Sequence, residues 1–201
     1  MDQTRLHVNE VFNAMRTNVI HSRIYEEAVK TIAVTSPGPR EGKTTVATNF
    51  AKSLSQLMKK VVIIDLDLRR PRVHEVLNIK RTPGFTNVLL RNKTLEESIH
   101  EVENPNLCLL PSGPLPPNPS EVLGAKRTFG LISECKKRFD YIIIDTPPVG
   151  IFSDALIINK VIDGYLLVTS IGQSDKSLTK QSVERIRQSK TPLLGVVANN
   201  A

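Results

Sequence analysis

The chain has 201 residues, of which 40% are hydrophobic, so one domain spanning residues 1–201 can bury a sizeable core. No segment approaches the roughly 20 consecutive apolar residues that cross a bilayer, and none near the start forms the apolar region of a signal peptide, which predicts a cytoplasmic protein that reaches a membrane only through a partner. The formal net charge is +7, but basic residues are scattered and aromatic residues make up only 4%, so we do not expect nucleic acid as a partner.

Apolar residues at helical spacing predict an amphipathic helix over residues 6–20, within an N-terminal segment of residues 1–25. Beyond it, continuous apolar runs alternate with helical patterns, as a parallel sheet covered on both faces requires. The predicted strands are 31–35, 61–65, 107–110, 141–145, 164–170 and 193–198, and the predicted helices are 44–58, 85–91, 95–100, 119–137, 154–161 and 175–190. The sequence therefore predicts an α/β three-layer fold with a mostly parallel central sheet flanked by helices.

Residues 111–119 are rich in proline, which lacks an N–H group and cannot lie inside a helix or a sheet. We expect a short rigid loop here. It leads directly to Ser120, which is predicted to cap the helix that follows.

The most informative stretch joins the first predicted strand to the next helix. It reads Ser36-Pro37-Gly38-Pro39-Arg40-Glu41-Gly42-Lys43-Thr44. Unpaired amides and the positive end of the helix dipole converge at such a place and form an anion hole that suits the phosphates of a nucleotide. Lys43 would reach the β- and γ-phosphates, and the Thr44 hydroxyl would bind Mg²⁺. Because proline stands at position 37, where glycine is usual, a simple Gly/Pro turn is the alternative interpretation.

Three carboxylates follow two of the apolar runs. Asp65 and Asp67 end the run from Val61, and Asp145 ends the run from Tyr141. The carboxyl ends of parallel strands bind ligands, and Mg²⁺ needs only one or two carboxylates besides phosphate oxygens. Asp65 and Asp67 would point to the same side if the backbone stays extended. Taken singly, each aspartate is also typical of a turn, but together they predict a metal-nucleotide site.

These segments together resemble the bacterial tyrosine kinases of capsule and exopolysaccharide export, relatives of the MinD/ParA class of P-loop ATPases. The resemblance covers about residues 10–199. Four segments carry it: a Walker A motif at 36–44, a Walker A′ motif at 62–71, a Walker B motif at 142–148, and the segment 112–121. The MinD/ParA ATPases have an additional lysine that would fall at position 38, where this chain has Gly38, so the kinases are the better match.

The resemblance implies transfer of the γ-phosphoryl group of ATP to a tyrosine hydroxyl in an autophosphorylating kinase. Catalysis would involve Lys43, Asp65 as the base, and Asp67. Mg²⁺ would bind Thr44, Asp67 and Asp145. The residues implied to contact ATP or ADP are Gly38, Arg40, Glu41, Gly42, Lys43, Thr44, Thr45 and, at the adenine, Asn199.

The implied partners are a transmembrane adaptor of the polysaccharide co-polymerase type, protein tyrosine substrates, and other copies of the chain. The protein would thus lie at the inner face of the cell membrane through its adaptor. The N-terminal helix would support oligomers through an E-x-x-R-x-x-R motif, which here begins at Glu10 and has Asn13 in place of the first arginine.

Two further departures from the family pattern leave alternatives open. Arg40 replaces a usual glycine, and a positive φ there costs about 1 kcal/mol or more. The chain also ends without the tyrosine cluster that is common in the family, so we expect the acceptor tyrosine in a tail beyond residue 201 or on another protein. A scaffold ATPase whose nucleotide state controls its association, or a regulatory module without catalysis, are the alternative functions.

Overall fold

The computed structural model describes residues 3–21 and 28–199. The strands are β1 (Thr31–Thr35), β2 (Val61–Asp65), β3 (His100–Val102), β4 (Asn104–Leu110), β5 (Tyr141–Asp145), β6 (Gly164–Ser170) and β7 (Leu193–Asn199). The helices are α1 (Gln3–His21), α2 (Lys43–Ser55), α3 (Val73–Val76), α4 (Phe85–Leu89), α5 (Leu95–Ser98), α6 (Pro119–Gly124), α7 (Lys126–Arg138), α8 (Asp154–Ile157), the 3-10 helix η1 (Ile158–Val161) and α9 (Lys176–Gln188).

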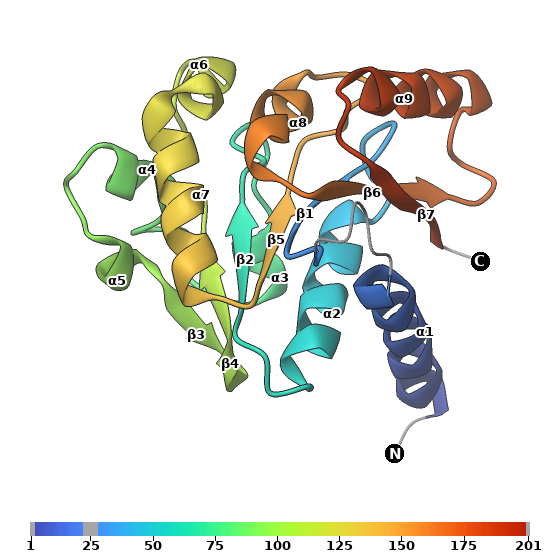
Figure 1. The fold of residues 1–201 in the computed structure, drawn as a ribbon, viewed down its shortest axis with the longest axis horizontal. Coiled ribbons are helices and arrows are strands. Elements are labelled where there is room, and N and C mark those ends of the chain that lie inside the picture. The colour runs from blue at the N-terminus through green and yellow to red at the C-terminus, as the bar shows by residue number, and fades with distance from the viewer. Residues whose placement is uncertain (1–2, 22–27, 200–201) are drawn as a thin grey trace.

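The strands form one seven-stranded sheet in the order β3-β4-β2-β5-β1-β6-β7. All neighbouring strands are parallel except β3 and β4, which pair in antiparallel fashion. The predicted α/β fold with a mostly parallel sheet is therefore confirmed (Figure 1). The order also places β5 between β1 and β2, so the three strands that precede the phosphate loop and the carboxylates are neighbours.

Each face of the sheet has its own apolar core because successive side chains of a strand point to opposite faces. Val61 and Ile63 of β2 pack with α2, whereas Val62 and Ile64 pack in the other core, with α7 to α9. All four side chains are fully buried. This two-sided burial explains why the strands read as continuous apolar runs, without the alternation of a half-exposed sheet.

Helix α1 lies beside α2 (Figure 1). Arg16 donates a hydrogen bond to the backbone oxygen of Ser53 in α2, and Val19 is buried. The helix was predicted over residues 6–20, and two parts of the proposed N-terminal segment 1–25, residues 1–2 and 22–25, lie outside the described residues. Within residues 3–21 and 28–199, no helix is both long and apolar enough to cross a membrane.

Several predicted boundaries were wrong. The pattern at 95–100 ends as a helix at Ser98, and the chain then forms β3, which is too short to show a period of its own. The helix predicted at 119–137 is divided at Ala125, whose backbone is extended. Ser120 is not its cap, because α6 begins at Pro119 after Asn118. The short helix α3 was not predicted, and the pattern at 154–161 ends in a 3-10 turn.

Candidate functional site

The phosphate loop has the strand-loop-helix geometry that the sequence predicted. It leaves β1 after Thr35 and enters α2 at Lys43. Arg40 has a φ of 63° and Gly42 a φ of 86°, so two nearby residues adopt the left-handed conformation. At Gly42 a side chain would also displace the Asn199 amide, since a Cβ atom would lie 2.0 Å from Nδ2 of Asn199. Arg40 therefore carries the backbone strain that its replacement of glycine implied.

Glu41 shapes the loop with its carboxylate. Oε1 accepts a hydrogen bond from the Gly38 amide at 2.8 Å, and Oε2 accepts one from the Ser174 hydroxyl at 2.7 Å. The Ser36 hydroxyl closes the same turn by donating to the Gly38 carbonyl at 2.6 Å. Glu41 is almost completely buried. Ser174, a serine in the turn after β6, could not be singled out from the sequence, because its partner lies 133 residues away.

Lys43 is held between two aspartates. Its ammonium nitrogen lies 2.9 Å from Oδ2 of Asp67 and 3.7 Å from Oδ1 of Asp145. Burial acts to lower the pKa of Lys43, but the charges of Asp145 and Asp67 outweigh that effect and raise it. The predicted lysine and two of the predicted carboxylates are thus brought together.

Asp65 and Asp145 stand side by side where two strands end. They are register partners in the β2–β5 ladder, and the alternation of the strands turns both toward the α2 face. Both side chains are fully buried. Burial raises the pKa of Asp145, and the Lys43 charge offsets only part of this. Burial, followed by the charges of Asp145 and Asp67, raises the pKa of Asp65 well above its usual value.

Asp67 lies two residues beyond Asp65, the last residue of β2. Their carboxylates contact different groups. Asp65 accepts hydrogen bonds from the amides of Asp67 at 3.2 Å and Val73 at 3.1 Å. Asp67 accepts one from the amide of Arg70 at 2.9 Å, in addition to its contact with Lys43. Asp65 therefore closes the loop that presents Asp67 to the phosphate loop.

The oxygen atoms around Asp145 fit a magnesium ion. Oδ1 of Asp145 is buried and accepts no hydrogen bond from any described residue, while Oδ2 accepts one from the Thr44 hydroxyl at 2.7 Å. Among residues 3–21 and 28–199, no group of three or more His, Cys, Asp or Glu side chains is arranged to hold a metal unaided. Mg²⁺ prefers oxygen ligands and commonly binds one or two carboxylates together with phosphate oxygens and water. Asp145 and Thr44 can provide the carboxylate and hydroxyl oxygens of such a site.

Two of the predicted nucleotide contacts lie at the margin of this cluster. Asn199 ends β7, and its side-chain amide donates to the backbone oxygen of Glu41 at 3.1 Å. The end of the last strand is thereby attached to the phosphate loop. Thr45 is exposed on α2, one residue beyond Thr44.

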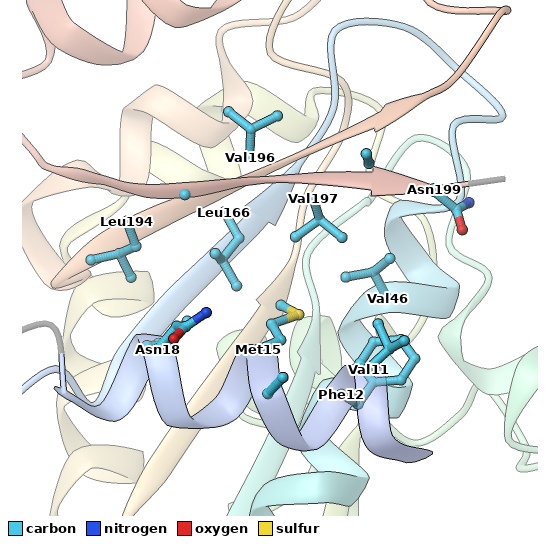
Figure 2. Close-up of a pocket in the computed structure, with 14 residues that line it drawn as sticks. Val11, Phe12, Met15, Asn18, Val46, Leu166, Leu194, Val196, Val197 and Asn199 are labelled. Atoms are coloured by element: carbon cyan, nitrogen blue, oxygen red, sulfur yellow. The ribbon is translucent and has the colours of Figure 1, made fainter. Parts of the chain in front are cut away.

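An apolar groove of about 710 Å³ runs between α1 and the strands β6 and β7. Figure 2 shows Phe12 and Met15 of α1 facing Leu166 and Val197 across it, with Asn199 at one end. Its lining is mostly apolar, unlike the charged cluster around Lys43. The groove therefore adjoins the loop 36–42 at Asn199 and is separate from the predicted phosphate site.

The sequence matches one family profile and is similar to known tyrosine-protein kinases. A family profile described as "AAA domain" matches residues 29–174. "Tyrosine-protein kinase YwqD" of Bacillus subtilis (strain 168) is 37% identical over 191 residues, which cover 95% of this chain and 80% of that protein. "Tyrosine-protein kinase CpsD" of Streptococcus agalactiae serotype III (strain NEM316) is 39% identical over 191 residues, covering 94% and 81%.

Two solved structures share the fold. The chimerical protein CapA2B2 superposes with a TM-score of 0.92 at 34% identity, covering 96% of this chain and 84% of that one. The septum site-determining protein MinD of Pyrococcus horikoshii OT3, in complex with Mg-ADP, gives a TM-score of 0.69 at 25% identity, covering 83% and 68%.

Proposed function

This chain belongs to the bacterial tyrosine-protein kinase family, and on that basis we propose that it transfers the γ-phosphoryl group of ATP to a protein tyrosine hydroxyl with Mg²⁺. In enzymatic terms it would be a non-specific protein-tyrosine kinase of the autophosphorylating type. The process it would regulate is the synthesis and export of capsular or extracellular polysaccharide. The four motifs noted in the sequence predicted this membership.

One observation supports the proposal more than any other. Lys43 begins α2 after the phosphate loop, within 4 Å of Asp67 and Asp145, and the buried Oδ1 of Asp145 has no hydrogen-bond donor in the described part of the chain. A cation, a helix N-terminus and a carboxylate oxygen without a hydrogen-bond donor, brought together where the strands end, are elements that bind a magnesium triphosphate. The related MinD structure contains Mg-ADP.

The residues of the site have separate tasks in this proposal. The loop amides and Lys43 bind and orient the phosphates, and the Thr44 hydroxyl, Asp67 and Asp145 hold Mg²⁺. Magnesium, when bound, neutralises charge on the phosphate oxygens. Because phosphoryl transfer depends mostly on position and charge neutralisation, these groups supply most of what the reaction needs.

Asp65 is the proposed base that takes the proton of the acceptor hydroxyl. A raised pKa suits a group that must accept a proton near neutral pH. Both of its oxygens accept backbone hydrogen bonds, however, and the side chain is fully buried. The base role thus requires that acceptor binding displaces the amide of Val73 or of Asp67. Loss of transfer without loss of nucleotide binding in Asp65→Asn would support this role.

The acceptor tyrosine is proposed to come from another protein molecule. Tyr165 is fully buried in β6, and its hydroxyl donates to the backbone oxygen of Ala155 at 3.0 Å. Tyr141 is half-buried at the start of β5. Tyr25 lies outside the described residues. We further propose that a transmembrane adaptor holds the protein at the inner membrane face, and that copies of the chain associate with help from the N-terminal helix.

The test is a transfer assay with labelled ATP, Mg²⁺ and a glutamate–tyrosine copolymer as the acceptor. Phosphotyrosine should form with the wild-type chain and should be lost in Lys43→Met. The matched control is Lys52→Met, because Lys52 lies on the same helix but forms an exposed pair with Glu103. Release of free phosphate without phosphotyrosine would refute the kinase proposal.

That outcome would favour the second candidate, a nucleotide-switched scaffold ATPase, to which the MinD superposition lends support. Association of the chain should then depend on ATP without transfer to any acceptor. Calorimetry with Mg-ADP separates both candidates from a regulatory module, which would bind no nucleotide at all.

A further inference from the structure

A buried carboxylate outside the metal-nucleotide site is tied to the Walker A′ loop. Asp154, the first residue of α8, has a fully buried side chain. Arg69 binds it with two nitrogens, Nε at 2.7 Å from Oδ2 and Nη2 at 3.1 Å from Oδ1. The Ser120 hydroxyl donates to Oδ1 at 2.8 Å. We propose that Asp154 is a positioning residue that acts through Arg69 to hold Asp67 in its magnesium-binding place, an inference that rests on the proposed function.

Arg69, Ser120 and Asp154 each contact the other two. Nη2 of Arg69 also lies 3.0 Å from the Ser120 hydroxyl, and the guanidinium carbon lies 4.2 Å from the centre of the Phe152 ring. A guanidinium that is bound by both oxygens of a carboxylate and stacked on an aromatic ring has a fixed direction as well as a fixed place. The Arg69 side chain is therefore a rigid anchor for the loop that carries it.

Three connections meet at this anchor. Arg69 belongs to the loop between β2 and α3, Ser120 is the second residue of α6 after the proline-rich loop that follows β4, and Phe152 and Asp154 follow β5. Since β4, β2 and β5 are parallel neighbours, these connections all leave the same edge of the sheet. The segment 112–121, whose role the sequence did not explain, thus contributes Ser120 to a network beside the Walker A′ loop.

Asp67 is two residues from Arg69 and is reached through the backbone between them. Its Oδ1 accepts the amide of Arg70, the neighbour of Arg69, at 2.9 Å. A shift of Arg69 would move this amide and with it the carboxylate that contacts Lys43 at 2.9 Å. A displacement of about 1 Å is enough to impair a catalytic group. The loss of a partner behind a metal ligand costs roughly 10- to 100-fold in metal affinity or activity. Asp154 should therefore influence the Mg²⁺ requirement without touching the ion.

A matched control exists at the opposite edge of the sheet. Asp163 precedes β6 and accepts hydrogen bonds from the amides of Lys30 at 2.9 Å and Thr31 at 2.8 Å. It also pairs with Lys136 at 3.3 Å. Its replacement removes an aspartate that also has both an ion pair and further hydrogen bonds, though a more exposed one, from the amino ends of the strands, opposite the carboxyl ends that carry the site.

The experiment compares the wild-type chain with Asp154→Asn, Ser120→Ala and Asp163→Asn. Calorimetry measures ADP affinity with EDTA and at increasing Mg²⁺, and the transfer assay measures the Mg²⁺ concentration for half-maximal rate. For Asp154→Asn we expect ADP affinity in EDTA to be unchanged and the Mg²⁺ requirement to rise roughly 10- to 100-fold. Ser120→Ala should change in the same direction by a smaller factor, and Asp163→Asn should match the wild type. A merely structural role would lower the melting temperature without moving the Mg²⁺ requirement.

An unchanged Mg²⁺ requirement in folded Asp154→Asn would overturn the inference. If that variant does not fold, an unchanged requirement in Ser120→Ala would do the same. If the wild type binds Mg-ADP but transfers nothing to tyrosine, the proposed function fails, and the calorimetric Mg²⁺ dependence still decides the role of Asp154. If the wild type binds no nucleotide, both fail.

Discussion

The replacement of Lys43 by methionine tests how much its ammonium group stabilises the buried carboxylates around it. Three buried aspartates, Asp65, Asp67 and Asp145, lie around this one ammonium group. Methionine has a similar length and helix propensity, so the substitution removes the charge and little else. We expect the chain without nucleotide to lose stability, because two carboxylates then lie buried beside an apolar side chain.

The magnitude follows from the distances. With an effective dielectric constant of about 20, unit charges at the separations of 2.9 Å and 3.7 Å attract by about 6 and about 4.5 kcal/mol. Desolvation opposes much of this attraction, and removal of one partner from a buried pair typically costs roughly 3 to 5 kcal/mol. For a chain of this size such a loss lowers the melting temperature by roughly 10 °C. Lys52→Met, which breaks the exposed pair with Glu103, should cost less than about 1 kcal/mol.

Urea denaturation of both variants at several pH values checks this reasoning. Burial raises the pKa of Asp145, and loss of the Lys43 charge should raise it further. A carboxyl group whose pKa is higher in the folded than in the unfolded chain binds more protons when folded, so its contribution becomes less favourable as pH rises above about 4. The deficit of Lys43→Met should therefore be larger at pH 8 than at pH 5. A deficit below about 1 kcal/mol, or one independent of pH, would refute the electrostatic account.

Further substitutions test the loop and the core. Arg40→Gly should raise stability by about 0.5 to 1 kcal/mol in thermal unfolding, because relief of the left-handed strain exceeds the added entropy of glycine; a lower melting temperature would show that the Arg40 side chain makes a stabilising contact. Gly42→Ala should lower the free energy of unfolding by about 1 to 2 kcal/mol and weaken Mg-ADP binding, because the new Cβ atom meets the Asn199 amide at 2.0 Å. Adding Asn199→Ala should then restore part of the stability. Tyr165→Phe should cost about 1 to 2 kcal/mol, since the buried Ala155 carbonyl loses its donor, and mass spectrometry should find the phosphotyrosine yield unchanged; a lower yield would mean that Tyr165 is an acceptor.

Local patterns in the sequence were enough to predict much of the fold. Four of the predicted strands, among them 61–65 and 141–145, have the observed bounds, because a strand buried on both faces must be apolar throughout. The strand β3 was missed, since three residues from His100 to Val102 show no period, and its pairing with β4 depends on contacts rather than on composition.

The sequence alone determined the phosphate loop, the helix that begins at Lys43, and the aspartates at the strand ends, because each depends on residues adjacent in the chain. Only the tertiary structure decided what those groups contact. The order of the strands places Asp145 beside Asp65, and it brings Arg69 to Asp154 across 85 residues of sequence. Such pairings are set by the packing of whole strands and helices against a common sheet, and no local spacing encodes them.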